Sequence, residues 1–179
     1  MAGSWIRLAH VKLASANATI DTANDSSFSG NDFGAYDKLH VEFYTQSDAN
    51  DHYCTMRFNA DNSSNRYSYQ KNADFEVPDG NANVNAPHND VYVHTRNSFN
   101  VMDIDNKAGK EKLALLRNIG CTTGKTNPPA YRQYASKWVE TTNQITRISV
   151  HQGNGSNTFD AGSYITVFGH SDDVISDEK

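Results

Sequence analysis

The sequence predicts an all-β protein, a two-layer antiparallel β-sandwich of about eight to ten strands. Apolar and polar residues alternate along most segments that contain apolar side chains, which turns one face of each strand inward. Clusters of Asn, Asp, Ser and Gly separate these segments and are typical of turns. No segment clearly favours a helix, so the strands are expected to bury their apolar faces against one another.

Size and charge narrow the class of protein. The 179 residues suit a single domain, which we expect over 1–170, followed by a polar, acidic tail over 171–179. The net charge of −5 argues against a free-standing nucleic-acid binder, which would carry a basic face. No apolar run approaches the roughly 18 residues that a membrane-spanning helix needs. We therefore expect neither a nucleic acid nor a membrane as partner.

The first half of the chain contains the clearest alternation. The segment 5–13 predicts a strand, and 18–22 is expected to be its hairpin partner. The segment 24–36 is rich in Asn, Asp, Ser and Gly and predicts a loop. The segment 37–45 is the clearest half-buried strand, and a further strand is expected over 52–59.

The second half combines short strands with long connections. After a strand that begins at 66–70, the segment 75–90 is too long for an ordinary loop and is expected to be functional or to become ordered on assembly. Strands are expected over 91–94, 98–105 and 131–140. The long connections favour a jelly roll over an up-and-down barrel.

Two motifs carry a resemblance to a known family. Residues 145–169 read Ile-Thr-x-Ile, a loop of Gly, Asn and Ser, then Phe-x-Ala-Gly-Ser and a terminal Gly. Residues 57–69 begin Arg-Phe-Asn-Ala-Asp and end Tyr-Ser-Tyr. Both motifs resemble small jelly-roll virion structural proteins of tailed bacteriophages. The chain departs from that pattern at Ala60, where Gly is usual, and at Arg66, which is inserted.

The resemblance implies a fold and a function. It implies a strand over 110–119, where helical spacing of the leucines is the alternative. It further implies a structural protein of the virion, either on the head exterior or in the tail apparatus, made in the host cytoplasm. Of these we favour a capsid decoration or cement protein on the head exterior. Such a protein binds the major capsid protein and copies of itself. The segments 75–90 and 171–179 are the candidate contact arms.

A tail or tail-fibre module that recognises host surface carbohydrate is the alternative function. Four tyrosines are expected to line one outer sheet face: Tyr44, Tyr53, Tyr67 and Tyr69. Tyrosines on a sheet face can stack against sugar rings, although cross-strand packing or a protein interface also accounts for them. A carbohydrate-active enzyme is a third hypothesis, and it requires two converging carboxylates.

Motifs for catalysis and for nucleotide binding do not reach their usual form. Residues 120–126 imitate a phosphate-binding loop, but three residues separate the glycines instead of four, and Pro128 and Pro129 argue against the helix that should follow. The sequence contains no Gly-x-Ser-x-Gly elbow and no evident Cys/His pair. We predict a protein that is not an enzyme and needs no cofactor.

Metal-ligating residues are scattered. His52 and Cys54 share a strand face but are too few for a zinc site. The segments 79–83 and 103–106 offer oxygen ligands without matching a calcium-binding loop, and turn chemistry explains both, although a calcium ion that staples a loop is an alternative. We predict no metal site.

The remaining polar and thiol groups are expected to be structural. Cys54 is expected to be buried and Cys121 to be a free thiol in a loop, with a disulfide between them left open because the sequence does not give their separation. Lys107, Lys110 and Lys112 are interrupted by Glu111, so they are expected to form a solvated hairpin instead of an anion site.

Overall fold

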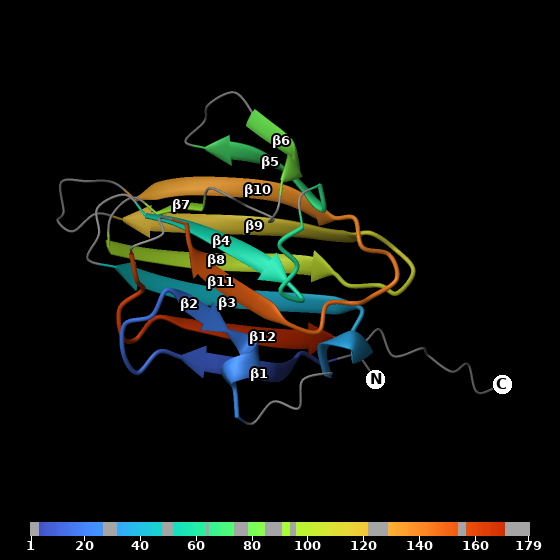
Figure 1. Cartoon of the computed structure of the whole chain (residues 1–179), viewed down its shortest axis with the longest axis horizontal. Helices are drawn as coiled ribbons and strands as arrows, with labels where there is room; N and C mark the ends of the chain where they lie inside the picture. Colours follow the sequence, from blue (N-terminus) through green and yellow to red (C-terminus); the bar gives the residue numbers. More distant parts are fainter. Residues whose placement is uncertain are drawn as a thin grey trace.

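The computed structural model describes residues 4–26, 32–47, 52–63, 65–73, 79–84, 91–93, 96–121, 129–153 and 157–170. Two antiparallel sheets pack face to face as a β-sandwich, as predicted (Figure 1). The described ranges contain no α-helix and only two short 3-10 turns, η1 (Thr22–Asn24) and η2 (Asp32–Ala35).

The larger sheet has eight strands. In spatial order they are β1 (Ile6–Lys12), β12 (Tyr164–His170), β3 (Lys38–Ser47), β8 (Arg96–Asp105), β9 (Lys112–Cys121), β10 (Ala130–Trp138), β5 (Tyr67–Ala73) and β6 (Asp79–Val84). The smaller sheet has four strands and lies in front of the larger one in Figure 1. Its spatial order is β2 (Thr19–Asp21), β11 (Ile148–Gln152), β4 (His52–Phe58) and β7 (Val91–Val93).

Strand β9 settles the choice between strand and helix over 110–119. Its side chains alternate strictly between buried and exposed from Lys112 to Ile119, which is the two-residue period of a strand. Both neighbours pair with it along nearly its whole length, since β8 and β10 are antiparallel to it. The strand implied by the family resemblance is confirmed.

Two expectations about the strands are wrong. The segment 18–22 does not pair with the first strand: β2 pairs with β11, whereas β1 pairs with β12. The chain passes from the larger to the smaller sheet between β1 and β2, so each strand adds to a different layer. The segment 75–90, expected to be a long connection, contains strand β6, which pairs with β5 and is one of the twelve strands in the described ranges.

The core lies between the two sheets and follows the predicted alternation. Leu39, Val41 and Phe43 of β3 are fully buried, as are Met56 and Phe58 of β4. Burying a side chain of this size stabilises the fold by about 1.5–3 kcal/mol. Phe58 contacts the rings of Tyr67 and Trp138 on the opposite sheet, with centroids 6.2 and 5.9 Å apart.

Lys112 does not belong to a solvated hairpin as expected. Its side chain is buried, and its ammonium donates hydrogen bonds to the main-chain carbonyls of Lys110 (2.6 Å) and Glu140 (3.3 Å). Burial lowers the pKa of Lys112, and the charges of Glu140 and Asp105 oppose this effect. Lys112 therefore joins the turn between β8 and β9 to the end of β10.

Cys54 is buried and is a free thiol, as its place in the alternation predicts. Burial raises the pKa of Cys54 to about 12, against the weaker effect of its hydrogen bond to Thr45. The side chain of Cys121 lies outside the described residues, as do the side chains of 79–83, most of the phosphate-loop-like segment 120–126 and the whole tail 171–179.

Candidate protein-binding face

The four tyrosines of the predicted aromatic face do not share one surface. Tyr44 lies on the outer face of β3, because its neighbours Phe43 and Thr45 are buried. Tyr67 is only 1% exposed, and its hydroxyl hydrogen-bonds to main-chain atoms of Phe58 and Asp61. Two residues further along β5, Tyr69 also faces inward and packs against the core.

The prediction of one face is therefore corrected for Tyr67 and Tyr69. Both side chains point inward. Tyr67 is paired with Trp138, which is itself buried, and Tyr69 has the same strand parity as Tyr67. Tyr53 belongs to the other sheet, and its side chain lies outside the described residues. Of the four, Tyr44 remains a candidate contact residue on the outer surface of the larger sheet.

The strand registers place Tyr44 in a row of five large side chains that crosses the larger sheet. From β12 to β10 these outward-facing, directly paired residues, here called the outer row, are Tyr164, Tyr44, Phe99, Ile119 and Tyr131. The exposed fractions of Phe99, Ile119 and Tyr131 are 39%, 48% and 46%. The row is thus an apolar surface that is directly accessible.

Aromatic contacts hold one end of the outer row in place. The rings of Tyr44 and Tyr164 stack with centroids 5.9 Å apart and planes inclined by 24°. The His10 ring lies 5.8 Å from the ring of Tyr164, and the His10 Nδ1 hydrogen-bonds to the hydroxyl of Thr166 (2.9 Å). These contacts orient the rings before any partner binds, which lowers the entropy cost of binding.

A charged cluster borders the outer row on the same face. The Arg117 guanidinium donates to the Asp103 carboxylate (2.9 Å), and the His40 Nδ1 lies 2.7 Å from the same carboxylate. The His40 Nε2 lies 3.6 Å from the Glu42 carboxylate. Glu42 and Arg117 flank Val101 on neighbouring strands, directly beside the outer row.

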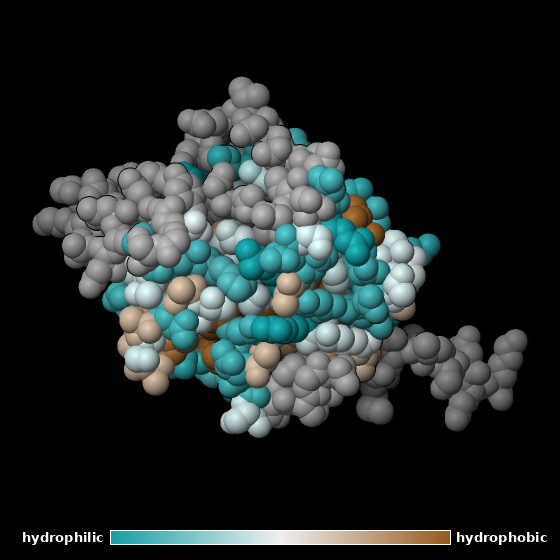
Figure 2. Space-filling model, viewed as in Figure 1, coloured by the Kyte–Doolittle hydropathy of each residue, from teal (hydrophilic) through white to brown (hydrophobic). Residues whose placement is uncertain are grey.

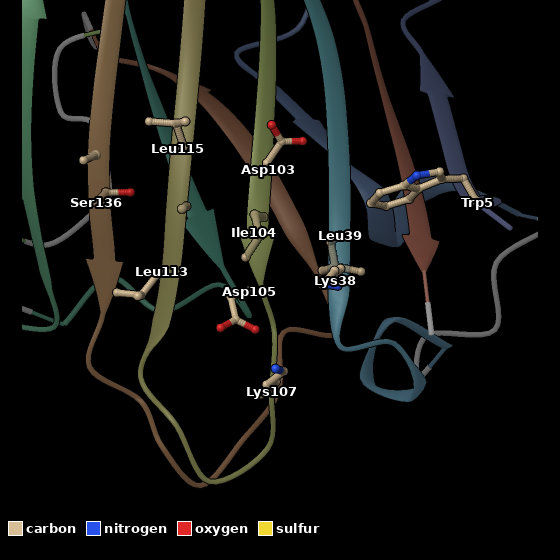
Figure 3. A pocket seen from close by; sticks show the side chains of 12 residues that line it. Trp5, Lys38, Leu39, Asp103, Ile104, Asp105, Lys107, Leu113, Leu115 and Ser136 are labelled. Atoms are coloured by element: carbon tan, nitrogen blue, oxygen red, sulfur yellow. The ribbon is translucent and has the colours of Figure 1, made fainter. Parts of the chain in front are cut away.

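A hollow of about 650 Å³ lies further along the same face (Figure 3). Trp5 stands on one side of it and Leu113 and Leu115 on the other, with exposed fractions of 51%, 54% and 38%. The Trp5 ring is held between His40 and His170, with centroids 5.7 and 5.2 Å away. The hollow therefore continues the apolar surface beyond the charged cluster.

The opposite side of the molecule has a different character. Figure 2 shows the side over the smaller sheet, where the described surface is mostly hydrophilic and its apolar areas are small and separate. Among the residues whose side chains the structure describes, the large apolar ones that are exposed all lie on or beside strands of the larger sheet. They are Trp5, Ile6, Phe99, Leu113, Leu115, Ile119 and Tyr131.

The charged groups of this face are engaged with one another. Asp103, for which turn chemistry was expected and a calcium ligand was the alternative, is bonded to His40 and Arg117. Among the described residues, no group of three His, Cys, Asp or Glu side chains is placed to hold a metal ion. In the same part of the chain, no helix is long and apolar enough to cross a bilayer.

The outer face of β9 has one signal in the sequence that simple alternation does not capture. The run Leu-Ala-Leu-Leu over 113–116 is apolar at both strand parities. A continuous apolar run is typical of a strand that is covered on both faces. In the structure Leu113 and Leu115 are exposed on the outer face, so the run places apolar side chains on an accessible surface.

The residues that carry the family resemblance lie in turns and in the core. Gly162 has a φ of 94°, a left-handed conformation that glycine adopts without strain, and Ser163 is buried with its hydroxyl accepting from the Gln46 main chain (3.0 Å). Asp61 accepts a hydrogen bond from the Trp138 indole (2.9 Å). These motifs shape turns and core packing, and the motif in 145–169 also contributes Tyr164 to the outer row. Comparison with protein-family models, curated proteins and solved structures finds no match to this chain.

Proposed function

We propose that this β-sandwich is an assembly module that binds another protein through the outer face of its larger sheet. The exposed apolar row from Tyr164 to Tyr131 carries this proposal. Contiguous exposed apolar surface is rare on proteins that act alone and is typical of interaction sites. The apolar outer side of β9 supports the same function, because its sequence pattern is that of a covered strand.

The composition of the face favours a protein partner over a carbohydrate. Stacking against a sugar ring uses aromatic side chains, whereas Ile119, Leu113 and Leu115 are aliphatic. The tyrosine pair that could stack on a sugar, Tyr44 and Tyr164, is stacked on itself. Aromatic side chains mixed with aliphatic ones and surrounded by charges are typical of the central part of a protein interface.

The biological role that we propose is that of a tailed-phage virion protein, in particular a capsid decoration or cement protein on the head exterior. The motifs in 57–69 and 145–169 support this role by resemblance, and a jelly-roll connection of the strands is part of the same proposal. A cement protein links several weak contacts, and the linkage raises the effective concentration of each. The tail 171–179 is the candidate for a second contact.

The test places one charge in the outer row and one outside it. Ile119→Asp changes a residue that is 48% exposed within the row, and Ile6→Asp changes one that is 50% exposed on the edge strand β1. We expect the unmodified protein and the Ile6 variant to co-sediment with heads of the phage that encodes the chain. We expect the Ile119 variant to bind at least 10-fold more weakly.

The outcomes separate the alternatives. Equal binding by both variants would remove the outer row from the contact. Particle density at the tail tip, together with binding to host glycans on an array, would favour the receptor-binding alternative, for which the three tyrosines of the row are the supporting observation. Absence of the protein from purified particles would reject the virion role itself.

A further inference from the structure

We infer that the partner at the outer row is a second copy of this chain, packed face to face through the larger sheet about a two-fold axis that runs along β8. The inference rests on the proposed function, since it requires that this face binds protein. In the dimer, Ile119→Asp weakens binding to heads by removing the second copy, whose linked contacts raise the avidity. It names the partner and the residues that meet. The symmetric pairing of opposite charges on the face carries it.

Stacking two such sheets follows ordinary sheet packing. Sheets that pack face to face lie about 10 Å apart, with their strands within about 30° of each other. A two-fold axis along β8, between the layers, places β3 of one copy over β9 of the other and β12 over β10. Within the outer row, Tyr44 then meets Ile119, Tyr164 meets Tyr131, and Phe99 meets Phe99 of the second copy.

The same operation pairs the charges beside the row. Glu42 and Arg117 lie one strand to either side of β8, at the same level, because both are in register with Val101. The axis therefore brings Glu42 of each copy opposite Arg117 of the other, so two ion pairs form. The two side chains are 38% and 47% exposed in the single chain, so both can reach a partner.

Two outward carboxylates of β8 lie on the axis, Asp103 and Asp105. The charge of Asp105 interacts with that of Lys112 in its own chain, and the charge of Asp103 is balanced by direct bonds. Asp103 belongs to β8, so it approaches Asp103 of the second copy. Its carboxylate is bonded to Arg117 (2.9 Å) and His40 (2.7 Å) within its own chain. Arg117 thus lies between Asp103 of its own chain and Glu42 of the second copy, and the charges alternate across the contact.

The area is sufficient for a specific interface. Five strands about 4.8 Å apart span about 24 Å, and the seven residues from Phe99 to Asp105 span about 24 Å along the strand. The face therefore covers about 600 Å² on each copy, or about 1,200 Å² in total. A specific interface needs about 1,000 Å², so the face is large enough for a dimer.

The test exchanges the two charges between copies. We expect the unmodified protein to sediment as a dimer at about 20 µM, and Glu42→Arg and Arg117→Glu each to sediment as monomers, because each places like charges opposite each other twice. An equimolar mixture of the two variants restores both ion pairs and is expected to give a heterodimer. Lys110→Glu reverses an exposed charge in the turn between β8 and β9, outside the strands of the contact, and should leave the dimer intact.

The readouts distinguish this inference from the proposed function. Circular dichroism of each variant checks that the monomers are folded. Arg117→Glu also removes the ion pair with Asp103, which can lower the stability of the single chain. Glu42→Arg changes the contact with His40, so it tests the dimer without loss of the Asp103 pair. An unmodified protein that remains monomeric overturns the dimer, while binding to heads can still succeed. A dimer whose mixed variants fail to associate overturns the two-fold arrangement along β8.

Discussion

The Asn106 side chain forms with the Ile145 main chain the two hydrogen bonds that a neighbouring strand would supply. The Asn106 Oδ1 accepts from the Ile145 amide (2.7 Å), and the Asn106 Nδ2 donates to the Ile145 carbonyl (3.3 Å). The same Nδ2 also lies within hydrogen-bonding distance of the Phe33 and Tyr36 carbonyls. One buried amide thus joins three segments at the end of the sandwich where β8 finishes and β9 begins.

Asn106→Asp is therefore expected to destabilise the protein by about 3 kcal/mol or more. The carboxylate keeps the oxygen that accepts from Ile145, but it cannot donate to the three carbonyls, and it places a charge in a buried site. Urea unfolding measures the change. Asn62→Asp, at an exposed turn position, is the matched control and should stay within about 0.5 kcal/mol. Similar losses for both variants would contradict the role of Asn106.

Ala60→Gly is expected to stabilise the protein by about 0.5–1 kcal/mol. Ala60 has a φ of 56°, a left-handed conformation that costs a residue with a Cβ about 1–2 kcal/mol. Glycine removes this cost, and the larger entropy of glycine in the unfolded chain offsets part of the resulting gain in stability. The family pattern has Gly at this position. Thermal unfolding measures the change in stability. Ala108→Gly is the control, because Ala108 lies in a turn without a positive φ, and this variant should not be more stable than the unmodified protein.

Gly169→Ala is expected to destabilise the protein by about 1–3 kcal/mol through overpacking. A Cβ at Gly169 would lie 2.5 Å from the Tyr36 ring and 2.7 Å from the Leu8 side chain, closer than real contacts. Gly34→Ala is the control, because its Cβ would meet Thr146 at an ordinary 3.6 Å. Equal unfolding midpoints for the two variants would show that Tyr36 and Leu8 can move aside.

Asp21 is expected to make the fold sensitive to acid. Burial raises the pKa of Asp21, but hydrogen bonds from Arg147 and from the Ala23 amide outweigh it and hold the pKa below its ordinary value of 3.8. A carboxyl whose pKa is lowered by folding contributes stability above pH 3.8, and this is lost as the pH falls through the lower folded value. Asp21→Asn should remove about 1–2 kcal/mol at pH 7 and less at pH 2.

His151 is expected to cause a second loss of stability on acidification, and this loss begins at a higher pH than the loss from Asp21. Burial, followed by the charge of Arg57, lowers the pKa of His151 below 6.5, and its ring nitrogens hydrogen-bond to Thr19 (3.1 Å) and Ser149 (2.8 Å). The stability from the neutral ring is complete above pH 6.5 and decreases as the pH falls below it. Urea unfolding between pH 7.5 and pH 5 should decline less for His151→Gln than for the unmodified protein. Parallel declines would contradict this.

The face that we assign to protein binding depends on register, and the strand pattern alone does not provide it. Phe99, Ile119 and Tyr131 lie on three separate strands, and their alternation shows only that each points away from the core. They form a row because β8, β9 and β10 pair without a shift of register. A slip of one residue in any pairing would turn that strand's outer side chains inward.

The local alternation of apolar and polar residues determined the fold class and the inward residues of β3 and β4, because strand parity is a property of neighbouring residues in the chain. Only the tertiary structure decided that β2 joins β11, that Tyr67 turns toward Trp138 and that Lys112 is buried. Those outcomes depend on contacts between residues far apart in the chain, and the free energy of packing two whole sheets selects among pairings that each segment would accept equally well.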